Sequence, residues 1–458
     1  MARELLLNAF AMNTVGHMSP GLWRHPDDRS ADYRKLSYWT DLARLLERGK
    51  FDGLFIADVL GVYDVYDGRP DAALAAATQI PVNDPLLLVS GMAAATTHLG
   101  FGVTANLTYE HPYIFARRMT TLDHLTDGRI GWNIVTGYLD SAARGVGLTQ
   151  QRGHDERYDV ADEYVSVVRK LWEDSWADDA VRRDRATGVF TDPTKVQPVR
   201  WRGDFYSVDA IHLGEPSPQR TPVLYQAGTS SKGVAFAGKH AECVFVSGPS
   251  EAVIAPRVQA LRAAAAANGR APAAIKVFSL ATTIVAETDA EARARYRDYL
   301  VYVDPAGALA LMSGWTGVDF SSLDIDQEVR FVENEAGRAA LDNITRADPG
   351  RTWTVRQVLE HIGIGGIGPV FVGSPQTVAD ALLAWVEATD VDGFNLASVV
   401  APATFTDIVD LLIPELQRRG VFKRDYQNGT LRHKLFGAGD RLAQADVTPA
   451  SAPTVAAE

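Results

Sequence analysis

The sequence of 458 residues contains a single cysteine, Cys243. One thiol cannot form an internal disulfide, and no C-x-x-C pair is present, so a disulfide framework and a cysteine-based metal site are both excluded. Cys243 lies in the apolar run AECVFVS, where a free thiol is typical core filling.

Long apolar runs and an excess of basic residues are missing as well. No stretch approaches the ~18 consecutive apolar residues of a membrane span, and LLLNAF near the N-terminus is too short for the core of a signal peptide. Lys and Arg number 45 against 57 Asp and Glu, which gives a net charge of −12. Because so acidic a surface repels nucleic acid and anionic membranes, we expect neither as a partner. With no membrane span and no signal peptide indicated, we expect a cytoplasmic protein.

What the sequence does contain is an alternation of short apolar runs with amphipathic segments. The helical spacing is clearest after HDERYD, where Ala161, Tyr164, Val165 and Val168 recur on one face. Eight strand–helix alternations over this length predict an α/β protein with one (β/α)8 TIM-barrel domain, residues 1–440. The eight predicted strands are residues 5–10, 53–58, 99–107, 130–136, 221–228, 241–248, 274–286 and 394–401.

Two long segments do not follow this alternation, at about residues 176–220 and 306–369. Excursions of this length inside a compact domain are usually functional lids or oligomer contacts. The second segment ends in GIGGIGP, which matches G-x-G-x-x-G, but a helical pattern precedes it and Pro369 follows, so we expect a loop and not a dinucleotide site. Residues 441–458 are low in complexity, and we predict a disordered tail there.

The predicted strand IGWNIVT carries an amide side chain at a buried position. Its bulky residues, such as Trp132, suit the helix layer, so Asn133 should point into the barrel, and the same alternation turns Thr104 inward from the preceding strand. Asp58 ends the second strand at the carboxyl-terminal mouth, where barrel active sites lie. A buried amide is costly unless it is hydrogen-bonded. The mouth is therefore predicted to bind a flat, neutral, polar-edged ligand, and no clustered set of metal ligands is expected.

Five segments link the chain to a known family: FDGLFIADVLGVYDVY, QIPVNDPLLL, TYEHPYIFARRMTTLDHLTDGRIGWNIVT, HDERYDVADEYV and SPQRTPVLYQAGTS. Through them it resembles the bacterial luciferase-like FMN-dependent monooxygenases, in the subgroup of nitrilotriacetate, dibenzothiophene-sulfone and long-chain alkane monooxygenases, to which riboflavin lyase also belongs. The resemblance runs from about Asn8 to Phe436. It implies a TIM barrel, reduced FMN (FMNH2) supplied by a separate NAD(P)H:flavin reductase, O2 as oxidant, a small organic substrate and a homo-oligomer (dimer or tetramer).

The resemblance also implies which residues hold FMN. Those that line its ring are Asp58, Thr104, Asn133 and Thr136. Those that hold its phosphate are Tyr158 and the loop Ala227, Gly228, Thr229 and Ser230. The phosphate assignment agrees with physical expectation, because this loop lies between a predicted strand and a predicted helix, and a helix N-terminus binds anions.

The catalytic residues implied by the resemblance are Thr104 and Asn133, which would position O2 over the flavin, and His17. His17 is expected to act as a general acid or base, since an unperturbed histidine has a pKa near 6.5. The substrate would meet Thr14, His17, Tyr63 and Tyr138. The alkane enzyme has cysteine at the position of Thr14 and histidine at that of Tyr138, and an aromatic wall at Tyr138 favours a ring-containing substrate.

The resulting interpretation is a two-component FMNH2-dependent monooxygenase of a catabolic pathway, of long-chain alkane type by overall similarity. A riboflavin lyase-type or other heterocycle-cleaving flavin monooxygenase is an open alternative. A deazaflavin-dependent hydride-transfer oxidoreductase and a catalytically silent flavin-binding protein are further alternatives.

Overall fold

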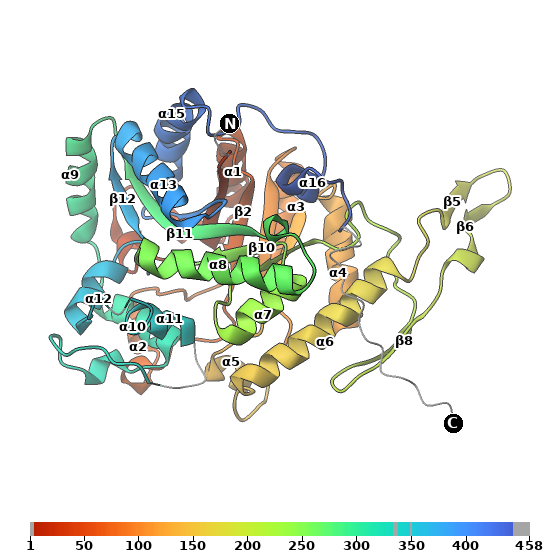
Figure 1. Cartoon of the computed structure of the whole chain (residues 1–458), viewed down its shortest axis with the longest axis horizontal. Coiled ribbons are helices and arrows are strands. Elements are labelled where there is room, and N and C mark those ends of the chain that lie inside the picture. Colours follow the sequence, from red (N-terminus) through yellow and green to blue (C-terminus); the bar gives the residue numbers. More distant parts are fainter. Residues whose placement is uncertain (1–3, 333–337, 349, 443–458) are drawn as a thin grey trace.

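The structure is a computed structural model that describes residues 4–332, 338–348 and 350–442 (Figure 1). Its centre is a closed barrel of eight parallel strands, in which the last strand pairs with the first. The predicted TIM barrel is therefore confirmed. In order around the barrel, the strands are β1 (Leu6–Met12), β2 (Gly53–Ala57), β3 (Gly100–Asn106), β4 (Ile130–Val135), β9 (Val223–Gln226), β10 (Cys243–Val246), β11 (Lys276–Val285) and β13 (Gly393–Ala397). Of the predicted tail, residues 441–458, the part from residue 443 onward lies outside the described residues.

Helices that connect the strands surround the barrel. Local sequence sets where several of them begin. In α4, for example, Pro112 occupies the first turn, and the His111 side chain accepts a hydrogen bond from the Tyr113 N–H. The helices of this layer are α1 (Leu36–Arg48), α3 (Leu86–Ala94), α4 (Pro112–Leu125), α6 (His154–Glu173), α7 (Ser231–His240), α8 (Glu251–Ala267), α9 (Asp289–Leu300), α13 (Pro375–Thr389), α14 (Ala403–Asp407) and α15 (Ile413–Arg418).

The two faces of β4 meet the environments predicted for them. Trp132 packs outward against the helix layer, with its ring centroid 4.6 Å from that of Phe115 and 5.9 Å from that of Tyr164. Gly131 faces the interior, where a Cβ atom would collide with the Tyr225 ring. Asn133, two residues on, shares that interior face.

Apart from the helix expected just before GIGGIGP, the insertions contain elements that the sequence did not reveal. Residues 176–220 form two antiparallel hairpins, β5 (Val181–Asp184) with β6 (Val189–Thr191) and β7 (Val199–Arg202) with β8 (Ser207–Ala210). Figure 1 shows the β5–β6 hairpin projecting far from the barrel. The second insertion holds α10 (Pro305–Thr316), α11 (Arg338–Asn343) and α12 (Val355–Ile362), with α10 against the short α2 (Asp71–Ala75). After it, β12 (Val370–Gly373) adds a ninth strand, which pairs with the carboxyl-terminal part of β11.

The amino-terminal end of the barrel is plugged by α16 (Leu431–Phe436). Leu431 and Leu435 pack among inward-facing aromatic rings that include Phe55 and Tyr225. The Leu431 N–H donates a 2.8 Å hydrogen bond to the Gly128 carbonyl. This end of the barrel interior is therefore filled, which leaves the opposite, carboxyl-terminal mouth for a cavity within the barrel.

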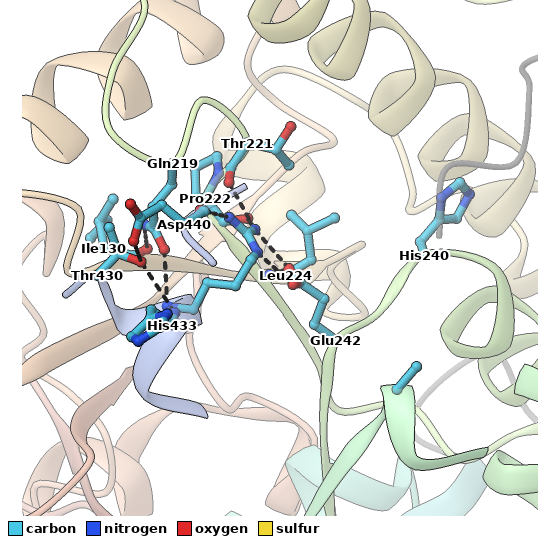
Figure 2. A network of polar contacts seen from close by, with 12 residues as sticks. Ile130, Gln219, Thr221, Pro222, Leu224, His240, Glu242, Thr430, His433 and Asp440 are labelled. Carbon is cyan, nitrogen blue, oxygen red and sulfur yellow. Dashed lines mark hydrogen bonds and ion pairs between the residues drawn. The ribbon is translucent and has the colours of Figure 1, made fainter. Parts of the chain in front are cut away.

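A buried ion pair fixes this plug. The Arg432 guanidinium donates to both carboxylate oxygens of Glu242, at 2.7 and 2.9 Å, and both side chains are almost fully buried. It also donates to the carbonyl oxygens of Thr221 and Pro222, which Figure 2 shows gathered beside Leu224 and Glu242. A buried charge pair is stable only when its remaining hydrogen-bonding atoms are satisfied, as here.

None of the described helices has both the length and the apolar character needed to cross a bilayer.

Candidate active site

A cavity of about 410 Å³ opens at the carboxyl-terminal mouth of the barrel. Its volume is within the usual range for small-molecule and cofactor sites. Twelve of the thirteen site residues predicted from the sequence line it, and Thr14 does not. The twelve are His17, Asp58, Tyr63, Thr104, Asn133, Thr136, Tyr138, Tyr158, Ala227, Gly228, Thr229 and Ser230.

Thr104 and Asn133 are direct neighbours across the β3–β4 register. The Asn133 amide nitrogen donates a 2.9 Å hydrogen bond to the Thr104 hydroxyl oxygen, and both side chains are buried. The amide oxygen of Asn133 is also buried, and no described residue donates to it. A buried acceptor without a partner is costly in a cavity wall, so this oxygen is a position where a ligand N–H or O–H would bind.

Asp58 follows β2 at the edge of the cavity. Burial, together with the nearby negative charge of Asp84, raises the pKa of Asp58 to about 6, although the Val59 N–H partly opposes this. Asp58 is therefore a carboxylate at neutral pH that takes up a proton in mild acid. Such a group can accept hydrogen bonds from the N–H edge of a ligand.

A cluster that suits an anion lies at the start of α7. The Ser230 hydroxyl oxygen caps this helix by accepting from the Gly233 N–H at 3.2 Å. The Tyr158 hydroxyl lies over the preceding loop so closely that a Cβ atom at Gly228 would collide with it. Backbone N–H groups at a helix N-terminus, with nearby hydroxyls, are the usual elements of a phosphate site.

Two members of this cluster were missed in the sequence, His154 and Arg157. His154 Nε2 lies 3.3 Å from the Ser230 hydroxyl, and its Nδ1 bonds the Asp155 carboxylate at 2.8 Å. Arg157 is only 3% exposed and, among the described residues that line the cavity, is the lone lysine or arginine. The helical periodicity held a signal for both, because residues 154, 157 and 161 share one face of α6. Through these two residues, a histidine and an arginine line the same cavity as Ser230 and Tyr158.

The structure corrects the expectation for His17. Its ring packs edge-on against Phe10, with centroids 4.4 Å apart, and lines the cavity. Burial lowers the pKa of His17 to about 3, far below the value near 6.5 that was expected. The imidazole is therefore neutral at pH 7, so it can offer an N–H and a lone pair but is not charged.

The predicted substrate residues separate into two places. The Tyr63 and Tyr138 hydroxyl oxygens lie 3.2 Å apart in the cavity wall, and Tyr63 also donates to Gln79 at 2.8 Å. Thr14, in contrast, donates its hydroxyl proton to the Pro81 carbonyl at 2.7 Å. The prediction that Thr14 faces this cavity does not agree with the structure, because its hydroxyl joins the segment after β1 to the segment after β2. Gln79 was missed, since it lies in an irregular segment that has no periodicity.

The second insertion supplies an apolar part of the wall. Trp315 from α10 and Ile367 from the GIGGIGP loop line the cavity beside Met18. Gly365 and Gly366 in this loop have positive φ angles of 79° and 68°, and a Cβ atom at Gly366 would approach the end of the Met18 side chain. The loop therefore shapes the cavity wall and is not a dinucleotide fingerprint, because a helix precedes it and a strand follows.

The donor set does not suit a metal ion. Within residues 4–332, 338–348 and 350–442, no group of three or more His, Cys, Asp or Glu side chains converges to hold one. The polar side chains of the cavity are mostly hydroxyls and amides, which are typical of an organic ligand with hydrogen-bonding edges.

Comparison with known proteins agrees with this geometry. The family model for luciferase-like monooxygenases matches residues 15–392. The dimethyl-sulfide monooxygenase of Hyphomicrobium sulfonivorans is 51% identical over 440 residues, which are 96% of this chain and 92% of that protein. The long-chain alkane monooxygenase of Geobacillus thermodenitrificans (strain NG80-2) is 46% identical over 440 residues, 96% of each protein. A crystal structure of riboflavin lyase with modified FMN and substrate riboflavin is 36% identical, with a TM-score of 0.90, over 97% of this chain and 98% of that one. The chain belongs to the luciferase-like monooxygenase family.

Proposed function

We propose that this chain is the oxygenase component of a two-component FMN-dependent monooxygenase. It takes reduced FMN from a separate NAD(P)H:flavin reductase and uses O2 to oxidise a small, uncharged organic molecule. One observation supports this above all others. The neutral Thr104–Asn133 pair, with an amide oxygen that no described residue bonds, lines the same cavity as the anion-binding cluster.

The residues of the cavity fit FMN. Arg157, Tyr158 and Ser230 would hold its phosphate, with the N-terminus of α7. Asp58 and Asn133 would bond the polar edge of its ring. When bound, reduced FMN supplies the electrons that activate dioxygen.

The protein itself would orient the polar groups that meet oxygen and exclude water from the cavity. Thr104 and Asn133 are held by each other and by the strand pairing, so their polar atoms are already oriented before oxygen arrives. His17, which lines the same cavity and is neutral at pH 7, offers a hydrogen bond without adding charge. The apolar wall that includes Trp315 and Ile367 keeps water out of the reaction.

The charges of the cavity indicate a neutral substrate. Arg157 is the one lysine or arginine among its described lining residues, and the phosphate would neutralise it. An anionic substrate would then be buried without a counter-charge, which is costly. Dimethyl sulfide and long-chain alkanes, named for two relatives, are both uncharged. We propose a small thioether or an alkane as the substrate class.

The test supplies the pure protein with FMN, NADH, a generic flavin reductase and a panel of thioethers and alkanes. We expect substrate-dependent oxygen consumption and an oxygenated product. Without the reductase, NADH should not be consumed. Oxidation of NADH by the pure chain would contradict the two-component scheme. A rate of oxygen consumption that no neutral substrate changes would contradict the substrate class.

A riboflavin lyase-type reaction is a second candidate. It is favoured by the likeness to riboflavin lyase over nearly the whole chain and by the Tyr138 ring, which could stack on a second flavin. Incubation with riboflavin in the same assay distinguishes the two, because cleavage would release a flavin ring fragment that mass spectrometry detects.

A further inference from the structure

A chain of hydrogen bonds runs through the cavity wall from a backbone carbonyl to a tyrosine. The Gln79 amide nitrogen donates to the His17 carbonyl at 2.8 Å. The Tyr63 hydroxyl donates to the Gln79 amide oxygen at 2.8 Å. The hydroxyl oxygens of Tyr63 and Tyr138 lie 3.2 Å apart. We call this series the Gln79 chain; Gln79, Tyr63 and Tyr138 all line the cavity.

The backbone at Gln79 has a strained, left-handed conformation. Its φ angle is 52°, a left-handed value that costs a residue with a Cβ atom about 1 kcal/mol or more. Its N–H donates to the Gly16 carbonyl at 2.8 Å, and the residue is buried. Strain of this kind persists only where the surroundings enforce it. The position of this amide is therefore fixed by the fold.

The direction of each hydrogen bond follows from the first. A backbone carbonyl can only accept, so the NH2 group of Gln79 must face His17 and its amide oxygen must face Tyr63. Tyr63 has one proton, which it donates to that oxygen. The bond between the two tyrosines must then be donated by Tyr138.

Tyr138 consequently presents no hydrogen-bond donor to the cavity. Its proton is committed to Tyr63, and only its oxygen lone pairs and its ring remain for a ligand. Tyr63 is fully buried, whereas Tyr138 is partly exposed to the cavity. Burial raises the pKa of Tyr138 to about 12 and the pKa of Tyr63 well above its usual value, so both stay protonated at neutral pH.

We propose that Gln79 is a positioning residue that fixes the hydrogen-bond polarity of the substrate wall. The wall thereby selects thioethers and hydrocarbons, which need no donor, over sulfones and other strong acceptors. A thioether sulfur is a weak acceptor and loses little where it faces Tyr138, whereas a sulfone oxygen that faces Tyr138 loses a hydrogen bond to water without replacement. This inference rests on the proposed function, because it takes the cavity as the substrate site.

The test compares two ligands of nearly equal shape, tetrahydrothiophene and its sulfone, sulfolane. Affinities are measured by saturation-transfer NMR on protein loaded with oxidised FMN, with no reductase, so that no turnover occurs. In Gln79→Met, Tyr63 becomes free to donate to Tyr138, and Tyr138 can turn its proton to the ligand. We expect the affinity for sulfolane, relative to tetrahydrothiophene, to rise about five- to tenfold, the worth of one hydrogen bond.

Three further variants distinguish a change in hydrogen-bond direction at Tyr138 from a general loss of protein stability. Tyr63→Phe should give the same rise, because it also frees the Tyr138 proton. Gln79→Glu should keep the wild-type ratio, because a carboxyl oxygen still accepts from Tyr63. Adding Tyr138→Phe to Gln79→Met should cancel the rise. A variant that was only destabilised would weaken both ligands and leave their ratio unchanged.

An unchanged ratio in both Gln79→Met and Tyr63→Phe, with both ligands still bound, would overturn the role of Gln79 alone. Failure of both ligands to bind any variant or the wild type would overturn the cavity as a substrate pocket and the selectivity with it. The proposed flavin chemistry is tested separately, by the reductase-coupled assay.

Discussion

Asn133 donates a 2.9 Å hydrogen bond to the hydroxyl of Thr104, and its amide oxygen has no partner among the described residues. The two side chains thus hold each other in place and leave one polar atom for a ligand. Such prior orientation is what makes a hydrogen bond useful in catalysis, because little reorganisation is needed when charge develops.

Asn133→Ala should lower the rate of product formation by about 100-fold, the usual effect of losing one positioned donor, because the Thr104 hydroxyl that the amide holds would no longer be fixed. FMN affinity should fall by no more than about tenfold, because the ring loses one hydrogen bond while the phosphate site is untouched. Coupled assays with fluorescence titration of FMN measure both. Thr104→Ser, which keeps the hydroxyl, is the matched control and should retain most of the activity. Near-normal turnover in Asn133→Ala would refute the role of the pair.

Ser230→Asp should weaken FMN binding by roughly 10- to 100-fold, because it places a negative charge against the phosphate. Aspartate caps a helix as well as serine does, so α7 should stay intact. The neutral isostere Ser230→Asn is the control and should bind FMN almost normally. Riboflavin, which has no phosphate, should bind all three proteins alike. Equal loss of riboflavin affinity in Ser230→Asp would exclude a phosphate effect.

Asp58→Asn should stabilise the protein above pH 6. The folded-state pKa of Asp58 is raised from 3.8 to about 6, so its ionised form is less favourable in the folded protein than in the unfolded chain. This penalty is full above pH 6 and disappears as the pH falls below about 4. We expect a gain of roughly 3 kcal/mol at pH 8 and none near pH 4. Urea unfolding at the two pH values measures the difference, and a gain independent of pH would argue against titration of Asp58.

Arg432→Met should cost about 3–5 kcal/mol of stability, because it leaves Glu242 buried without its counter-charge. Arg424→Met, on the same carboxyl-terminal segment but exposed, is the control and should change stability by less than about 0.5 kcal/mol. The double variant Arg432→Met with Glu242→Gln should recover part of the loss. Equal, small effects of Arg432→Met and Arg424→Met would show that the buried pair does not hold the barrel plug.

The local sequence determined much of the framework. All eight barrel strands lie where apolar runs indicated them, because a strand buried on both faces needs such a run whatever surrounds it. The alternation along β4 was enough to turn Asn133 inward and Trp132 outward, since side chains alternate strictly in a strand. The position of the loop that we propose for the phosphate, between a strand and a helix, also followed from local sequence.

Only the tertiary structure decided which of the candidate side chains act together. Thr14 lies three residues before His17 in the sequence, yet its hydroxyl is taken by Pro81 and not by the cavity. Gln79 begins the family segment QIPVNDPLLL, but no periodicity assigned its side chain to the site. It lines the cavity because the segments after β1 and β2 meet there. The pKa of His17 likewise depends on how much of the fold covers it. Periodicity is a property of neighbours along the chain, whereas burial, hydrogen-bond direction and charge depend on residues far apart in it.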